Sequence, residues 1–226
     1  MPTVLKIAIC LFQDVTSLDY QGPMEQIVFL TASNLARLPK EFGLEDAPYV
    51  IEETYLAASE DPIHPAAGPR LLPDRTYDSV GAGEQFDVIL VPGGLGAEPG
   101  KIHPSLFAFL KRQTPGVKYL LSVCTGSWIL AQAGLLDGTR ATTNKATFRV
   151  VQEHTKGQNI EWVPKARWVV DGNYWTSSGV TAGIDMANAF LVHLIGKPAA
   201  DKIRGVVEAA TKEQGDDEFA GFWGLV

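Results

Sequence analysis

The stretch that most constrains the fold is residues 117–134, in which a strand-like run passes without a loop into a helix-like run. Residues 117–123 are mostly apolar and β-compatible, and residues 128–133 have helical character that ends near Gly134. Cys124 lies at the sharp turn between them. The backbone N–H groups of the helix point at this side chain, and their partial positive charge favours thiolate over thiol. The stretch predicts a reactive cysteine, and a buried structural cysteine is the alternative.

The rest of the chain continues this alternation of strands and helices. Residues 161–170 and 173–177 form a predicted hairpin around Asp171-Gly172. The pattern predicts an α/β fold with a doubly wound, mostly parallel sheet, helices on both faces and a β-hairpin addition. Residues 1–226 are expected to form a single domain. The other expected strands are 4–12, 49–57, 86–92, 117–123 and one near 140, and the expected helices are 22–36, 104–113, 126–134, 146–155, 181–195 and 199–213.

A second motif follows the buried-type strand 86–92. The strand stops at Pro92-Gly93-Gly94, where the backbone can approach a ligand closely. Parallel α/β sheets collect their chemistry beyond the carboxyl ends of their strands, so this loop is expected to meet Cys124. The N–H groups near Gly94 and Thr125 are candidate oxyanion donors.

A carboxylate lies in the loop after the first strand. Asp19 precedes Gly22-Pro23, which open the expected helix 22–36. The same topology brings this loop toward Cys124, where Asp19 could exchange protons with a substrate. Capping of the helix or its turn is the alternative role of Asp19.

These segments carry a family resemblance when they are taken with Gly-Val-Thr-Ala-Gly-Ile-Asp at 179–185. In order, they resemble the ThiJ/PfpI superfamily, with its flavodoxin-like, class I glutamine amidotransferase-like fold, from residue 4 to about 210. The branch with an Asp before Gly-Pro and a Thr after the nucleophile contains isonitrile hydratases and the amidotransferase-like domains of certain AraC-type regulators. Asp19 and Thr125 match that pattern.

The resemblance implies a lyase that adds water to an isonitrile and releases an N-substituted formamide, without a cofactor. Cys124 would be the nucleophile, Asp19 the proton donor and acceptor, and Thr125 a residue that orients water or Asp19. Gly93, Gly94 and Leu95 would bind the substrate or an oxyanion. The expected partners are a small-molecule substrate and a second copy of the chain in a homodimer.

Two alternatives to the hydratase remain. One is a glyoxalase-like or deglycase-like enzyme that acts on α-oxoaldehydes through a hemithioacetal on Cys124. The other is a non-catalytic sensor in which this cysteine is oxidised.

The histidines do not support metal or dyad chemistry. His64, His103, His154 and His193 lack metal-ligand spacing, so no metal is expected. The protease-like branch has a His after the nucleophile, where this chain has Thr125. Many relatives have another His at the position of Asn144, which is expected either to line the pocket or to serve a structural turn.

Composition narrows the class of protein further. A net charge of −7 gives no basic excess for nucleic acid, and no segment has the 18 apolar residues of a membrane span. Without a signal-like start, the chain is expected to be soluble and cytoplasmic. Cys10 is expected to pack in the core. The apolar residues 219–226 predict a docked or partner-facing segment.

Overall fold

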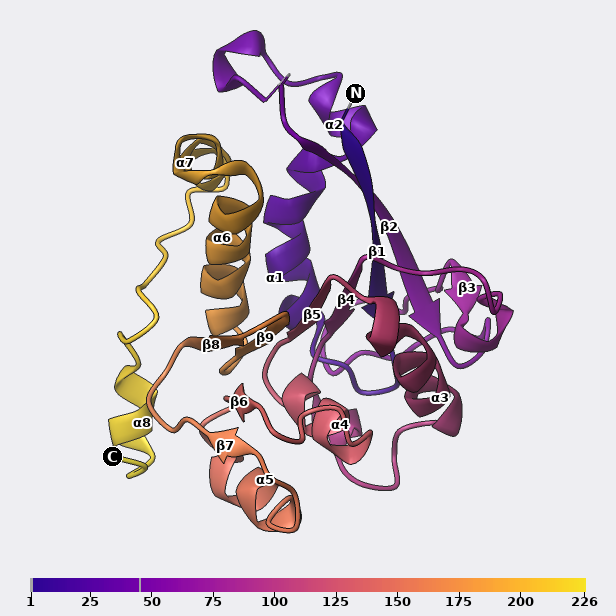
Figure 1. Ribbon diagram of the computed structural model, residues 1–226, viewed down its shortest axis with the longest axis vertical. Coiled ribbons are helices and arrows are strands. Elements are labelled where there is room, and N and C mark those ends of the chain that lie inside the picture. The colour runs from indigo at the N-terminus through magenta and orange to yellow at the C-terminus, as the bar shows by residue number, and fades with distance from the viewer. Residues whose placement is uncertain (1, 45) are drawn as a thin grey trace.

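The computed structural model describes residues 2–44 and 46–226. A seven-stranded sheet runs through the molecule in the order β3-β2-β1-β4-β5-β9-β8, with helices on either side (Figure 1). All pairings in it are parallel except that of β8 with β9, which form the expected antiparallel hairpin. The strands are β1 (Thr3–Cys10), β2 (Tyr49–Ala57), β3 (Arg75–Thr76), β4 (Val88–Val91), β5 (Tyr119–Ser122), β8 (Trp168–Asp171) and β9 (Tyr174–Ser177); β6 (Arg140–Ala141) and β7 (Glu161–Trp162) pair separately.

Strand order determines where a site can form. From β1 the chain moves to β2 on one side and later returns to β4 on the other, so the order reverses between β1 and β4. In an open parallel sheet, loops leave such a switch point in opposite directions and open a crevice at the carboxyl ends of the strands. The segments that follow β1, β4 and β5 therefore meet at one edge of the sheet.

The helices cover both faces of the sheet, as predicted. Their bounds are α1 (Ser17–Ile27), α2 (Ala32–Leu35), α3 (Pro104–Gln113), α4 (Gly126–Gln132), α5 (Phe148–His154), α6 (Ala182–Ile195), α7 (Lys197–Val206) and α8 (Glu218–Phe222). Buried side chains of α1, α6 and α7 form one core with the sheet, and those of α3, α4 and α5 form another. Figure 1 shows α1, α6 and α7 together on one side and α3 and α4 on the other. No helix among the described residues is long and apolar enough to cross a bilayer.

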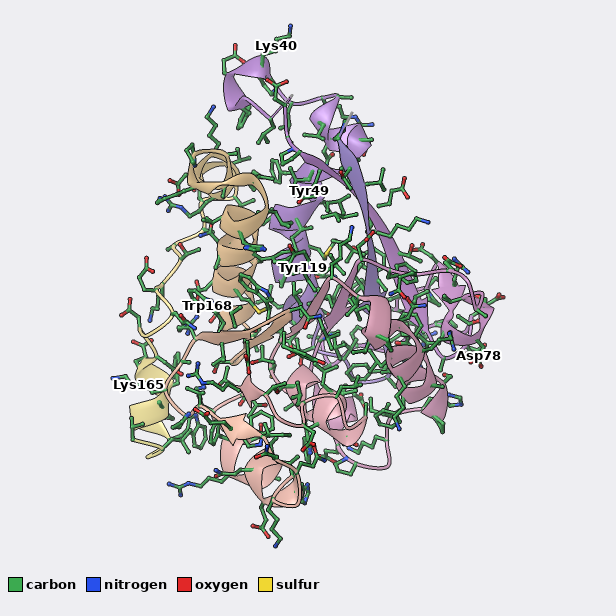
Figure 2. All side chains as sticks on the ribbon, viewed as in Figure 1. Lys40, Tyr49, Asp78, Tyr119, Lys165 and Trp168 are labelled. Carbon is green, nitrogen blue, oxygen red and sulfur yellow. The ribbon has the colours of Figure 1, made fainter. Side chains whose placement is uncertain are left out.

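Adjacent side chains of one strand supply the two cores, since alternate residues of a strand face opposite sides. On β5, Leu121 packs with the α1 and α6 side and Leu120 with the α3 and α4 side. Tyr119 makes an edge-to-face contact with Phe190 of α6, with ring centroids 5.1 Å apart. Figure 2 shows Lys40 and Asp78 at the periphery of the molecule.

Some expected boundaries were wrong. Helix α1 begins at Ser17, before the expected residue 22, and contains Pro23. A proline inside a helix removes one backbone hydrogen bond. Burial of side chains such as Tyr20 and Met24 offsets the stability that is lost with this bond. The expected strand 161–170 is interrupted and forms β7 and β8 in different sheets. The last expected helix, 199–213, ends as α7 at Val206.

The short elements β3 and α8 were not predicted. Strand β3 extends only over Arg75–Thr76, and α8 only over Glu218–Phe222. Elements this short have too few residues to show a period in the sequence. The prediction that the apolar C-terminal segment docks on the protein is confirmed for α8, where Ala220 is fully buried.

Candidate active site

Three segments converge beyond the carboxyl ends of β1, β4 and β5. Asp19 comes from the first turn of α1, Gly93 follows β4, and Cys124 follows β5. The backbone N–H of Gly93 donates a hydrogen bond of 2.9 Å to Oδ2 of Asp19. The predicted meeting of the three segments is present in the structure.

Cys124 occupies a strained turn between β5 and α4. Its φ angle of 60° lies in the left-handed region, where a non-glycine residue is uncommon. Its N–H donates to the carbonyl of Ser178 at 2.9 Å. Helix α4 lies so close to β4 that a Cβ on Gly126 would stand 2.0 Å from the carbonyl oxygen of Val91. Packing against β4 and the hydrogen bond to Ser178 therefore hold Cys124 in the strained conformation.

Asn144 contacts the sulfur directly. Its Nδ2 donates to Sγ of Cys124 at 3.2 Å, and its Oδ1 accepts from the N–H of Ala146 at 2.9 Å. Because a backbone donor occupies the oxygen, the NH₂ group is the end that faces the sulfur. Asn144 thus lies beside Cys124 and also stabilises the turn that follows it.

The environment of Cys124 favours a thiol at rest. Burial raises the pKa of the Cys124 thiol to about 12, and the nearby Asp19 carboxylate raises it further. Hydrogen bonds from Asn144 and from the N–H groups of Thr125 and Val180 act in the opposite direction. The donors at the helix start favour the thiolate, as the sequence predicts, but burial has the larger effect on the pKa of this thiol.

Asp19 has an equally perturbed environment. Burial raises the pKa of its carboxyl to about 7, against hydrogen bonds from Gly93 and the Cys124 thiol that lower it. Its alternative role as a helix cap is excluded, since Thr16 is the N-cap residue of α1 and the Asp19 carboxylate accepts from Gly93 instead. A carboxyl that titrates near neutrality beside a thiol is suited to moving a proton.

The predicted oxyanion donors are otherwise engaged. The N–H of Gly94 donates to Oγ1 of Thr125 at 2.9 Å, and the same hydroxyl donates back to the carbonyl of Gly94 at 3.2 Å. The Thr125 hydroxyl thus joins two loops and does not orient Asp19. The N–H of Leu95 faces the carbonyl of Asp14 in the antiparallel bridge between Val15 and Gly94, so it is not a free donor either.

A cavity of about 250 Å³ adjoins the cysteine. Asn144 and Val180 line it, and both donate hydrogen bonds to the sulfur. Phe219 and Trp223 line it from the C-terminal segment. A larger cavity of about 650 Å³ lies between α1, α6 and that segment, and it shares Arg167, Thr181 and Phe219 with the small one.

Two buried ion pairs flank the small cavity. Nζ of Lys145 lies 3.2 Å from Oδ2 of Asp217, and Nη2 of Arg167 lies 2.5 Å from Oδ2 of Asp185. Sequence reasoning missed both pairs, because the partners are distant in the chain. It also assigned no role to Val180, although the segment 179–185 carried part of the family resemblance.

Among the described residues, no three His, Cys, Asp or Glu side chains are placed to hold a metal ion. Cys10 is fully buried, and burial raises the pKa of its thiol above its ordinary value. The prediction that Cys10 packs in the core is confirmed.

Sequence comparison relates the chain to known enzymes. Residues 5–193 match the DJ-1/PfpI family. An isonitrile hydratase from Pseudomonas putida is 32% identical over 207 residues, which are 91% of this chain and 79% of that protein. A deglycase from Pyrococcus horikoshii is 29% identical over 160 residues, or 70% of this chain and 92% of the relative.

Solved structures agree on the fold. A ThiJ/PfpI family protein from Pseudomonas syringae superimposes with a TM-score of 0.72 at 26% identity, covering 93% of this chain and 77% of that one. DJ-1beta from Drosophila melanogaster gives a TM-score of 0.66 at 21% identity, covering 93% of this chain and 100% of its own.

Proposed function

The chain belongs to the DJ-1/PfpI family, which includes cysteine-dependent enzymes, and from that premise we propose that it is an isonitrile hydratase with Cys124 as nucleophile. The observation that carries the proposal is the set of four groups that contact one sulfur: the Asp19 carboxyl, the Asn144 amide and the backbone N–H groups of Thr125 and Val180. Similarity to a curated isonitrile hydratase along most of the chain supports the substrate class. The product is an N-substituted formamide.

In the first step, the proton of the Cys124 thiol passes to the Asp19 carboxylate as the sulfur attacks the terminal carbon of the isonitrile. Asp19 then returns that proton to the same carbon. One S–H bond breaks, an S–C and a C–H bond form, and the enzyme carries a thioimidate. Asn144 and the N–H groups of Thr125 and Val180 stabilise the transient charge on sulfur.

In the second step, the Asp19 carboxylate activates water for attack on the thioimidate carbon, and the nitrogen receives a proton. The tetrahedral species that results then collapses. Its C–S bond breaks, the hydroxyl proton leaves to the sulfur, and the formamide departs with the thiol restored.

The test is turnover of a panel of alkyl and aryl isonitriles, followed by mass spectrometry for the formamide. We expect product from at least part of the panel and a transient mass increase on the peptide that carries Cys124. A correctly folded protein that forms no formamide from any member would refute the hydratase assignment.

A deglycase-like activity on α-oxoaldehydes is the second candidate, favoured by the similarity to archaeal deglycases. It requires a hemithioacetal on Cys124, and it is weakened because an amide, that of Asn144, contacts the sulfur where an imidazole base would be expected. Consumption of methylglyoxal decides between the two. An oxidation sensor is disfavoured, because the raised pKa of the thiol keeps the oxidisable thiolate scarce.

A further inference from the structure

One wall of the cavity beside Cys124 is made by Phe219 of the C-terminal helix α8 and by Trp223, which directly follows that helix. From the geometry we infer that Phe219 and Trp223 form the subsite for the isonitrile substituent, and that this subsite selects neutral cyclic or aromatic groups. The inference rests on the proposed function for the identity of the substrate. The residues that line the cavity are Asn144, Lys145, Ala146, Arg167, Ser178, Gly179, Val180, Thr181, Phe219 and Trp223.

The position of the cavity relative to the sulfur supports this assignment. Asn144 and Val180 each contact the sulfur of Cys124 and also line the cavity. A substrate whose terminal carbon reaches the sulfur therefore extends its substituent between these residues and α8. A volume of about 250 Å³ leaves room for a six-membered ring beside Phe219 and Trp223.

The charge of the cavity wall explains the preference for neutral groups. Its two cations are already paired, Lys145 with Asp217 and Arg167 with Asp185. Both ion pairs are almost fully buried, so neither cation is free to bind a carboxylate. The large apolar side chains that a substituent meets there are Phe219 and Trp223.

Helix α8 is held firmly enough to act as a wall. Asp217 accepts from the N–H of Phe219 at the start of the helix and pairs with Lys145, the neighbour of Asn144. At the other end, Arg149 donates to the carbonyl of Gly224 at 2.6 Å. Despite this anchoring, the large side chains of Phe219 and Trp223 remain 43% and 47% exposed. Aromatic surface left open beside a reactive group is suited to ligand binding.

The test compares alkylation of Cys124 in the native protein by a small reagent, iodoacetamide, and a ring-bearing one, N-benzyl iodoacetamide. Rates are followed by peptide mass spectrometry and normalised to those of free cysteine. We expect Trp223→Ala to lower the benzyl-to-small rate ratio about tenfold while the small-reagent rate is kept. Ala146→Phe, which adds a ring to the wall of the cavity that Ala146 lines, should lower the ratio as well.

Phe222→Ala is the matched control, because Phe222 is on the same helix, is 76% exposed and does not line the cavity. An unchanged ratio in both Trp223→Ala and Ala146→Phe, or an equal fall in Phe222→Ala, would overturn the subsite. Faster normalised reaction with iodoacetate than with iodoacetamide would overturn the preference for neutral groups.

The same comparison can be made for catalysis by measuring turnover of benzyl isonitrile and methyl isonitrile. In Trp223→Ala, kcat/KM should fall about tenfold for the benzyl substrate and stay near wild type for the methyl one. Alkylation does not depend on hydration. If the alkylation ratio falls as expected but no isonitrile is turned over, the subsite is supported and the proposed function fails.

Discussion

At the scale of single residues, the chemistry depends on one proton shared between Cys124 and Asp19. The pKa of the thiol is raised to about 12 and that of the carboxyl to about 7, so near neutrality the pair holds the proton on sulfur. Attack by the sulfur requires transfer of this proton to Asp19. The pair titrates as a unit, and the reactive form is the one that has lost a single proton.

Replacement of the nucleophile should abolish the reaction without unfolding the protein. We expect Cys124→Ala to form no formamide, because no other thiol faces Asp19. Cys10→Ala is the control: it removes a fully buried side chain, should cost about 1 kcal/mol or more of stability and should keep turnover. Near wild-type hydration by Cys124→Ala would contradict covalent catalysis.

Asp19→Asn should lower kcat by about 10² to 10⁴, with a smaller effect on substrate binding. Wild-type kcat/KM should rise with pH through about 7 and then level off, because below that pH the carboxyl cannot accept the thiol proton. The variant should lack this inflection. A pH–rate profile of both proteins checks the prediction, and a shared inflection near pH 7 would assign the titration to another group.

The raised pKa of Asp19 also predicts how the free energy of unfolding depends on pH. Because the folded-state pKa of Asp19 is raised, the folded protein binds its proton more tightly than the unfolded chain does. The stability present at low pH is therefore lost as pH rises from about 4 to about 7. Urea unfolding of wild type and Asp19→Asn across this range should show the loss only in wild type.

At the scale of elements, the strained turn at Cys124 between β5 and α4 depends on the close approach of α4 to β4. Gly126→Ala places a methyl group 2.0 Å from the carbonyl oxygen of Val91, so the helix start must shift, at a cost of about 1–3 kcal/mol. Gly205→Ala in α7 is the matched control, since a Cβ there meets nothing within 4 Å. Thermal unfolding should separate the two, with Gly205→Ala equal to or more stable than wild type.

Attachment of α8 depends on the ion pair between Lys145 and Asp217. Asp217→Asn leaves a buried ammonium without its counter-charge, which should cost about 3–5 kcal/mol. The double change Lys145→Met with Asp217→Leu should cost less, because no charge stays buried. Unfolding free energies and limited proteolysis after residue 206 measure both effects. Equal losses in the two variants would mean that the pair is not the anchor.

At the scale of the whole molecule, one sheet carries both cores. Strands β4 and β5 contribute side chains to each side, so loss of one core exposes the sheet face that supports the other. We therefore propose that residues 1–226 unfold as one domain. Far-UV circular dichroism and tryptophan fluorescence should give coincident transitions, since Trp175 lies in one core and Trp128 in the other. Separate midpoints would indicate independent units.

The sequence by itself determined the fold class, the Cys124 elbow and the approach of Asp19 to it. These features follow from local patterns: an apolar strand, a sharp turn and a helix recur along the chain, and parallel topology brings their ends to one edge. Asn144 was also identified, but not which of its two suggested roles it serves. In the structure it contacts the sulfur and stabilises its own turn.

Three features were decided only by the tertiary structure. They are the protonation state of Cys124 and Asp19, the acceptors of the Gly93 and Gly94 N–H groups, and the contribution of the C-terminal segment to the cavity wall. Each depends on groups far apart in the chain: Gly93 reaches Asp19 across 74 residues, and Asp217 reaches Lys145 from the C-terminal segment. Burial sets the pKa of a thiol or carboxyl, and burial is a property of packing, not of the neighbouring sequence. For that reason the helix start alone predicted a thiolate, whereas the folded site holds a thiol.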